Sequence, residues 1–310
     1  MTSKYRIFFI ILSLTLLYCF VLETYIIKDG DTQSYIEISK SWDTLLRPIG
    51  YPILIRLSEF IDGYKFVILL QALMCAIIFQ VVHTITQSRF AIIALVLTGT
   101  YILYVPYLLS DLSFAFFIIL AYYYMREGTL GLHFLFLGIA SLFKPTLAWF
   151  FIAEPFIMWF KFKDTGLMIY SFFMCFIVTS FMPMKNFFEH GVWTHSQILK
   201  VSINEYYFSN ANNKILYMVY SLFSNAVSTH WNSFFSIFGF QKGVTKELWF
   251  NLINWIFALF YSVIWIRFII SSFYNKTFSK LLFVMYFMAP TIFCHSGGGR
   301  WRLPFEFLLF

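Results

Sequence analysis

Four carboxylates stand close together in a chain where charged residues are scarce. They fall in the stretch KDGDTQSYIEISKSWDTLLRPIGYP, residues 28 to 52, and are Asp29, Asp31, Glu37 and Asp43. Carboxylates at the mouth of a helix bundle can act as a general base or bind a metal ion. Helix capping is the alternative for Asp31, and Ser34 with Glu37 has the spacing of a capping box. These residues alone favour capping.

The same stretch ends in RPIGYP, residues 47 to 52. Pro48, Gly50 and Pro52 predict a bent, non-helical entry into the next segment. The guanidinium of Arg47 suits a phosphate group. A turn with an arginine that reaches the membrane interface is an equal alternative.

Two further charged residues interrupt apolar segments. Lys144 precedes Pro145 in GIASLFKPTLAWFF, and Glu154 precedes Pro155. A charged side chain at membrane depth is costly and marks a functional site by default. We therefore interpret Lys144 as a site residue. Glu154 is interpreted as a partner for a neighbouring cation or as a polar contact between helices.

The run HSGGGRWR, His295 to Arg302, joins three glycines to two arginines. Successive backbone amides in a glycine loop can bind an anion, and Arg300 and Arg302 would supply charge. A hinge before a helix is the alternative. Asp111, in LLSDLSF, stands at a predicted helix start, where capping explains it.

Other chemistries find no support in residue spacing. The chain has no zinc-ligand spacing, Walker loop, dinucleotide fingerprint or serine-hydrolase elbow, so no cofactor is expected and ligand spacing does not support a divalent metal. The four cysteines fall in apolar segments and are expected to be buried thiols. Basic residues at membrane edges account for much of the net charge of +7 without a nucleic-acid partner.

Composition sets the class of protein. Hydrophobic residues make up 60% of the chain and charged residues 12%, against roughly 25% charged in soluble domains. This predicts a single all-α domain, residues 1–310, that crosses a membrane many times. We expect about nine to ten spanning helices, with candidates at 7–27, 64–85, 90–108, 111–125, 130–143, 146–160, 166–184, 247–272 and 279–294.

The distribution of lysine and arginine predicts a cytoplasmic amino terminus. The segments 28–63, 109–111, 144–146, 185–246 and 295–302 then share the outer face. Two of them, 28–63 and 185–246, are long loops. Tyr35, Ile38, Trp42 and Leu45 recur at helical spacing in the first loop, so we expect helices lying in the membrane interface in both loops.

Taken in order, these patches resemble a known family. An acidic first loop with Asp31 followed four residues later by Tyr35, then RPIGYP, Ser-Asp, Lys-Pro and Arg-x-Arg-x-Pro resembles the GT-C fold glycosyltransferases, in particular bacterial relatives of the protein mannosyltransferase and aminoarabinose transferase group. The chain departs from that family in having Arg-Pro where Arg-x-Pro is commoner, and lysine where arginine is frequent before Pro145.

The resemblance implies an enzyme of a bacterial plasma membrane with its active face outside the cytoplasm. It would move a sugar from a polyprenyl-phosphate-linked donor to a glycan, lipid or protein acceptor by a single inverting displacement. The implied base is Asp31, with Asp29 as helper. The implied donor-phosphate ligands are Arg47, Lys144, Arg300 and Arg302, and the implied substrate contacts are Tyr35, Tyr51, Asp111 and His295.

Two other classes remain open. A polysaccharide polymerase or ligase also uses lipid-linked sugars and outer-face arginines, but the short chain and acidic first loop disfavour it. A lipid-linked sugar transporter or flippase predicts charges along a central path and inverted repeats, and the sequence has no internal repeat.

Overall fold

The computed structural model describes residues 5–21, 30–45, 47–61, 63–196, 214–228, 244–289 and 302–310. Within these ranges the chain forms 13 α-helices, together with short 3-10 turns, and no strand. The all-α prediction is confirmed for this part of the chain. One buried apolar cluster runs through it from the first helix to the carboxy-terminal segment.

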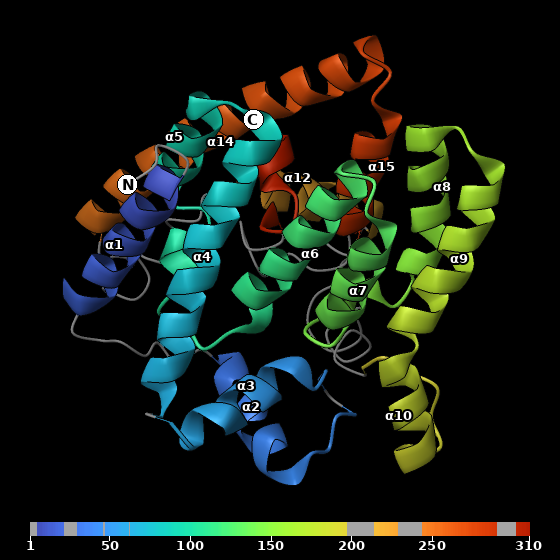
Figure 1. Cartoon of the computed structure of the whole chain (residues 1–310). Helices are drawn as coiled ribbons and strands as arrows, with labels where there is room; N and C mark the ends of the chain where they lie inside the picture. The colour runs from blue at the N-terminus through green and yellow to red at the C-terminus, as the bar shows by residue number, and fades with distance from the viewer. Residues whose placement is uncertain are drawn as a thin grey trace.

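The central helices run up and down beside one another (Figure 1). Because neighbours alternate in direction, every second connection lies at the same end of the bundle. The helices concerned are α4 (Tyr64–Thr86), α6 (Ser110–Arg126), α7 (Leu130–Ser141), α8 (Phe150–Phe162) and α9 (Thr165–Thr179), with α1 (Arg6–Val21) packed on α4.

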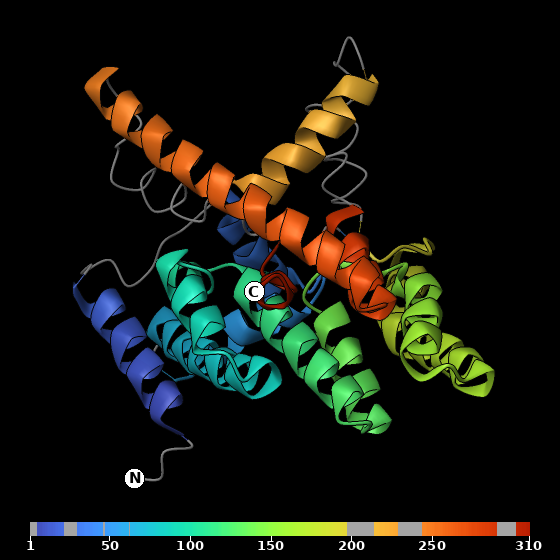
Figure 2. The same ribbon diagram turned by 90° about the horizontal axis from the view of Figure 1, so that it is seen from above.

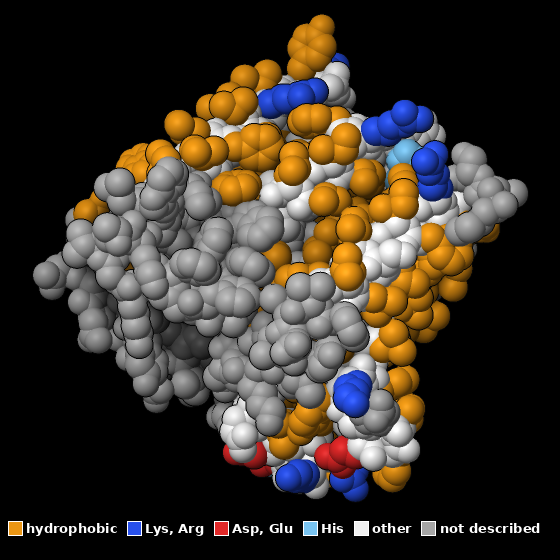
Figure 3. Space-filling model, turned by 90° about the vertical axis from the view of Figure 1, so that its left-hand side faces the viewer, with side chains coloured by type: hydrophobic (Ala, Val, Ile, Leu, Met, Phe, Trp, Pro, Cys, Tyr) orange, Lys and Arg blue, Asp and Glu red, His pale blue; other side chains and the backbone are white. Residues whose placement is uncertain are grey.

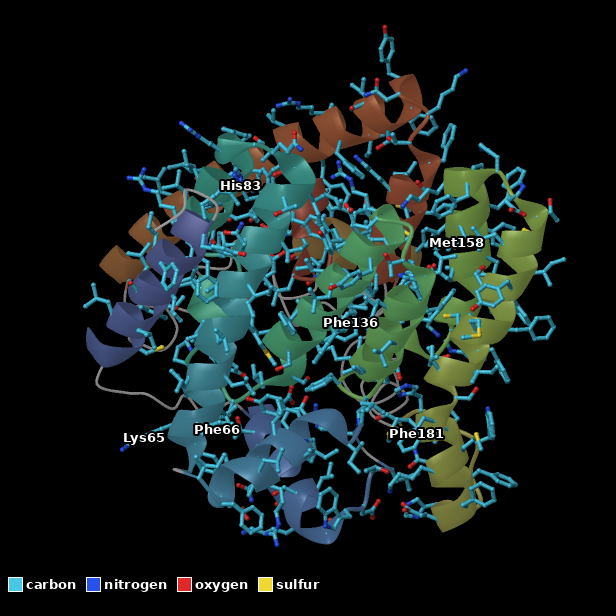
Figure 4. All side chains as sticks on the ribbon, viewed as in Figure 1. Lys65, Phe66, His83, Phe136, Met158 and Phe181 are labelled. Atoms are coloured by element: carbon cyan, nitrogen blue, oxygen red, sulfur yellow. The ribbon has the colours of Figure 1, made fainter. Side chains whose placement is uncertain are left out.

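Aromatic side chains fill the space between these helices. Phe136 of α7 stacks on Phe117 and Tyr124 of α6 (Figure 4). Phe150 of α8 lies 5.7 Å from Phe287, measured between ring centres. Phe287 belongs to α15 (Phe278–Met288), which packs on α8.

The first predicted outer loop forms two helices beneath the lower end of the bundle (Figure 1). They are α2 (Gly30–Ser41) and α3 (Gly50–Glu59). The predicted amphipathic pattern is visible in α2, where Tyr35 and Ile38 are buried. Trp42 falls outside the helix, because it adopts a positive φ of 61° and ends the helical run.

The remaining helices are shorter or inclined. They are α5 (Arg89–Leu97), α10 (Phe181–His190), α12 (Lys214–Val227) and α14 (Val244–Tyr274), with 3-10 turns η2 (Ile102–Tyr104), η3 (Pro145–Leu147) and η6 (Glu306–Leu308). Figures 1 and 2 show α14 inclined to the upright helices and crossing the side of the bundle where α12 lies. Residues 197–213 and 229–243 of the predicted second outer loop lie outside the described residues.

The prediction of nine to ten membrane-spanning helices is wrong by length and composition. Within the described residues two helices are long and apolar enough to cross a membrane, α4 and the Asn254–Tyr274 part of α14. A third span results if α9 and α10, bent by 42°, count as one.

Backbone breaks shorten the other segments. The predicted span 90–108 ends as a helix at Leu97, because Gly99 and Tyr101 adopt positive φ. The helix in the predicted span 130–143 has 12 residues, which reach about 18 Å at 1.5 Å per residue. That is well short of the roughly 30 Å hydrocarbon core of a bilayer.

Candidate functional site

Asp31 and Arg47 form the first half of the candidate site. Asp31 lies in the first turn of α2, and its Oδ1 accepts a hydrogen bond from the Arg47 guanidinium at 2.6 Å. The Arg47 side chain is 13% exposed and that of Asp31 36%. The acid therefore keeps access to solvent while its arginine is largely enclosed.

Asp31 is not the cap of α2, and Ser34 and Glu37 do not form the capping box that their spacing suggested. The helix already begins at Gly30, so Ser34 lies inside it and donates to the Asp31 carbonyl at 2.7 Å. A carboxylate in the first turn is favoured by the helix dipole. That position leaves the Asp31 side chain directed to Arg47.

Tyr35 connects this pair to the start of α6. Its hydroxyl lies 2.8 Å from Ser110 Oγ and accepts from Arg47 at 3.4 Å. The guanidinium carbon also lies 5.0 Å from the centre of the Tyr35 ring, a cation–π distance. Burial raises the pKa of Tyr35, and the opposing effect of Arg47 is smaller, so the phenol stays neutral at ordinary pH.

Lys144 and Asp111 form the second half. Lys144 Nζ donates to Asp111 Oδ1 at 2.5 Å, and the Asp111 side chain is only 4% exposed. Asp111 follows Ser110 in the first turn of α6. Lys144 has extended backbone, the conformation that a following proline favours, and this interrupts the helical path between α7 and α8. The cation is thereby placed in the turn that connects α7 to α8, which we call the α7–α8 hairpin although each helix packs mainly on other helices.

Backbone contacts hold the two halves together. The Gly50 amide at the start of α3 donates to the Leu142 carbonyl at 2.6 Å. A Cβ on Gly50 would lie 2.7 Å from that oxygen, so the approach needs glycine. The RPIGYP segment is therefore joined to the turn that carries Lys144.

A buried glutamine fixes the third side of the site. Gln71 of α4 accepts from the Tyr51 hydroxyl at 2.9 Å and donates to the carbonyls of Val105 and Tyr107 at 2.6 and 2.8 Å. Thr32 of α2 donates to the Leu108 carbonyl. These bonds anchor α2 and α3 to the segment that leads into Ser110.

The structure thus brings together five of the residues predicted from the sequence, Asp31, Tyr35, Arg47, Asp111 and Lys144, with Tyr51 packed edge-on against Tyr35. Asp29, His295 and Arg300 lie outside the described residues. Ser110 and Gln71 were not singled out as site residues. The signal that could have found Gln71 is an amide within the apolar sequence of α4, although Gln80 of the same helix shares it.

Arg302 has a different environment from the one predicted. It is fully buried, and its guanidinium donates to the carbonyls of Asn225, Ala226 and Ser228 at the end of α12. Its Nε also lies 3.4 Å from Glu306 Oε2. These contacts satisfy the last carbonyls of a helix, and none of them involves the Asp31–Lys144 cluster. Here Arg302 joins the carboxy-terminal segment to α12.

The described residues hold no group of three or more His, Cys, Asp or Glu side chains suited to a metal ion. The Asp31–Lys144 cluster consists of two carboxylates, two cations and a neutral phenol, which lie at one end of the bundle. Comparison of the chain with protein-family models, curated proteins and solved structures found no match.

Proposed function

We propose that the protein is a membrane glycosyltransferase that moves a sugar from a polyprenyl-phosphate-linked donor to an acceptor hydroxyl on a glycan, lipid or protein. One observation carries this proposal. Three segments far apart in sequence supply Asp31 with Arg47 and Asp111 with Lys144, and Tyr35 and Ser110 connect the two pairs. A base and two phosphate ligands are what such a transfer requires.

Each group has a role in that chemistry. Asp31 takes the proton from the acceptor hydroxyl, whose oxygen attacks the anomeric carbon. The bond from that carbon to the phosphate oxygen breaks, and the electron pair leaves with the phosphate. Arg47 and Lys144 stabilise the departing phosphate, since charge-assisted hydrogen bonds are strongest where charge develops.

Donor binding and base activation are linked in this scheme. Arg47 neutralises Asp31 in the structure described here. A phosphate that draws the guanidinium towards itself releases the carboxylate to act as base. The pairing also explains how two cations are kept at an apolar bundle end before the donor arrives.

The shape of the molecule supports a membrane location. On the described part of the face drawn in Figure 3, apolar side chains lie between the upper and lower parts, and acidic side chains lie beside basic ones at the lower end. Within the described residues, two to three helices are long and apolar enough to span a bilayer. We place the protein in the plasma membrane of a bacterium, with the cluster on the extracytoplasmic side, where a prenyl tail stays in the lipid.

The test is sugar transfer by the purified protein in detergent, with a panel of labelled prenyl-phosphate sugars and no ion gradient. We expect Asp31→Asn to lower the rate by ~10²–10⁴-fold, as loss of a general base does, while thermal protection by prenyl phosphate persists. Asp43→Asn is the matched control, because Asp43 is exposed in the same loop. Near-normal transfer by Asp31→Asn would assign Asp31 a structural role. Movement of lipid-linked sugar across vesicles without bond cleavage would favour a flippase instead.

A further inference from the structure

A second pair of ionisable side chains lies deep in the bundle, apart from the proposed site. His133 of α7 and Glu154 of α8 contact each other at 2.7 Å between Nε2 and Oε1. Their side chains are 2% and 0% exposed. The pair joins two helices whose main partners are elsewhere, because α7 packs chiefly on α6 and α9, and α8 on α9 and α15.

The contacts determine where protons lie. His133 Nδ1 is 2.9 Å from the carbonyl oxygen of Ala121. A carbonyl oxygen only accepts, so Nδ1 carries a hydrogen. The short contact between Nε2 and Oε1 then holds one proton, because a bare imidazole nitrogen and a carboxylate would repel each other. That proton belongs either to the imidazole, giving an ion pair, or to the carboxyl, giving a neutral pair.

The second carboxyl oxygen distinguishes these cases. Glu154 Oε2 is buried and has no hydrogen-bond partner. An ionised carboxylate with one oxygen unpaired in an apolar core is strongly disfavoured, whereas the carbonyl oxygen of a neutral acid is tolerated far better.

The nearest cations do not form an ion pair with Glu154. Among the described residues, Lys161 of α8 attracts Glu154 electrostatically, but its ammonium donates to the Met125 carbonyl, and Arg126 donates to the Ile85 carbonyl. From α9 the facing titratable group is the buried thiol of Cys175.

We propose that His133 and Glu154 form a neutral proton-sharing clasp: Glu154 Oε1–H donates to His133 Nε2, and His133 Nδ1–H donates to Ala121. The ligand of this site is a single proton.

The clasp acts on the hairpin that carries Lys144. His133 and Glu154 lie on its two arms, at nearly equal distances along the chain from the tip. The Leu142 carbonyl near that tip accepts the Gly50 amide, so the spacing of the arms bears on the Lys144 position. His133 and Glu154 are then positioning residues, and this last step alone rests on the proposed function.

The test is infrared spectroscopy of the full chain in detergent near neutral pH. We expect a carboxylic-acid C=O band that Glu154→Gln removes, and that Glu127→Gln, a change of an exposed acid between α6 and α7, leaves in place. Absence of such a band, with Glu154 contributing only carboxylate absorption, would overturn the proposal.

Variants add an independent readout. The amide of Glu154→Gln can donate to Nε2 as the acid does, so we expect its melting temperature to stay near that of the wild type. Glu154→Leu and His133→Leu should melt several degrees lower. A Glu154→Gln protein as unstable as Glu154→Leu would contradict a neutral clasp.

Positioning is tested by transfer kinetics. Glu154→Leu should raise KM for the prenyl-phosphate donor several-fold, and Glu154→Gln should restore it. An unchanged KM in Glu154→Leu would limit the clasp to stability. Absence of transfer by the wild type, with the acid band present, would refute the proposed function and leave the clasp standing.

Discussion

Each cation of the candidate site has a carboxylate within hydrogen-bond distance, Asp31 for Arg47 and Asp111 for Lys144. Taking charge out of water is costly unless an opposite charge repays it, and removing one member of a buried pair leaves the other uncompensated. Asp111 is the more enclosed of the two acids. The two pairs therefore differ in how much stability depends on them.

Variants of Lys144 and Asp111 can distinguish a role in stability from a role in binding phosphate. We expect Lys144→Gln to lower the free energy of unfolding by roughly 3–5 kcal/mol, because Asp111 is left buried without its cation. Adding Asp111→Asn should restore most of that stability, since no isolated charge remains. Protection by prenyl phosphate against thermal unfolding should stay lost in both variants.

Lys163→Gln is the control, because this lysine is exposed just beyond the far end of α8, away from Lys144. If the double variant regained prenyl-phosphate protection along with its stability, Lys144 would have no role in binding phosphate.

His195 predicts a specific pH dependence. Both ring nitrogens are buried without partners, and burial lowers the His195 pKa to about 4. The unfolded chain, with a pKa of about 6.5, therefore takes up the proton first as pH falls. The stability associated with the neutral ring is complete above about pH 6.5 and is lost as pH falls towards 4, with a full loss of roughly 3 kcal/mol.

The measurement is denaturant unfolding between pH 7 and pH 4 for the wild type and His195→Leu. Carboxylates titrate in both proteins, so the difference between the two curves reports His195. Parallel curves would show that the ring is not buried as a neutral group.

At the scale of elements, the start of α3 requires a glycine because another segment packs closely against it, and not because the chain turns there. The sequence predicts a bent entry at RPIGYP, and the helix does begin at Gly50. Its requirement for glycine comes from the Leu142 carbonyl of another hairpin, which a Cβ would approach to 2.7 Å. That contact holds the segment that carries Arg47 against the turn that carries Lys144.

Gly50→Ala should therefore be destabilising although alanine favours helices. Neither backbone can yield cheaply, so we expect a loss of roughly 1–3 kcal/mol, as for other overpacked sites. Gly131→Ala in α7 is the matched comparison, since nothing lies within 4 Å of its added Cβ, and it should gain up to about 1 kcal/mol. Thermal melts of both variants decide this, and equal stabilisation by both would contradict the close approach.

Sequence patterns predicted elements where the cause is local. The apolar run at 64–85 became α4, the spacing of Tyr35 and Ile38 became the buried side of α2, and Lys144-Pro145 broke a helical path. What depends on distant partners could not be predicted. Gln71 is determined by carbonyls more than 30 residues away, and Arg302 by the end of α12.

The count of spanning helices failed for a related reason. Averaged hydropathy does not register a backbone reversal, and positive φ at Gly99 and Tyr101 ends α5 within an apolar segment. The candidate site residues were selected because charged side chains are scarce in such a chain. The pairing of each cation with its carboxylate could not be predicted, because it depends on how three distant segments meet.

At the scale of the whole molecule, the two ends of the helices differ in charge: acidic and basic residues are mixed at one end, and basic residues outnumber acidic ones at the other. The end formed by α2, α3 and the start of α6 carries the candidate site. The opposite helix ends carry Arg6, Arg89, Arg126, Lys161 and Lys163. Basic residues mark the cytoplasmic side of membrane proteins, so the candidate site is expected outside.

Cysteine labelling tests this arrangement directly. In a protein with Cys19, Cys75, Cys175 and Cys294 replaced by alanine, single cysteines would replace Gln33 and Lys163, which are exposed on α2 and at the far end of α8. An impermeant thiol reagent added to intact cells should label the Gln33 position and reach the Lys163 position only after the membrane is opened. The expectation follows because α2 lies beneath the bundle and α8 ends at its upper side (Figure 1). Labelling of both positions from outside would mean that the bundle lies on one side of the bilayer. Labelling of the Lys163 position alone would reverse the orientation and place the candidate site in the cytoplasm, where the proposed transfer would have to use a donor facing inward.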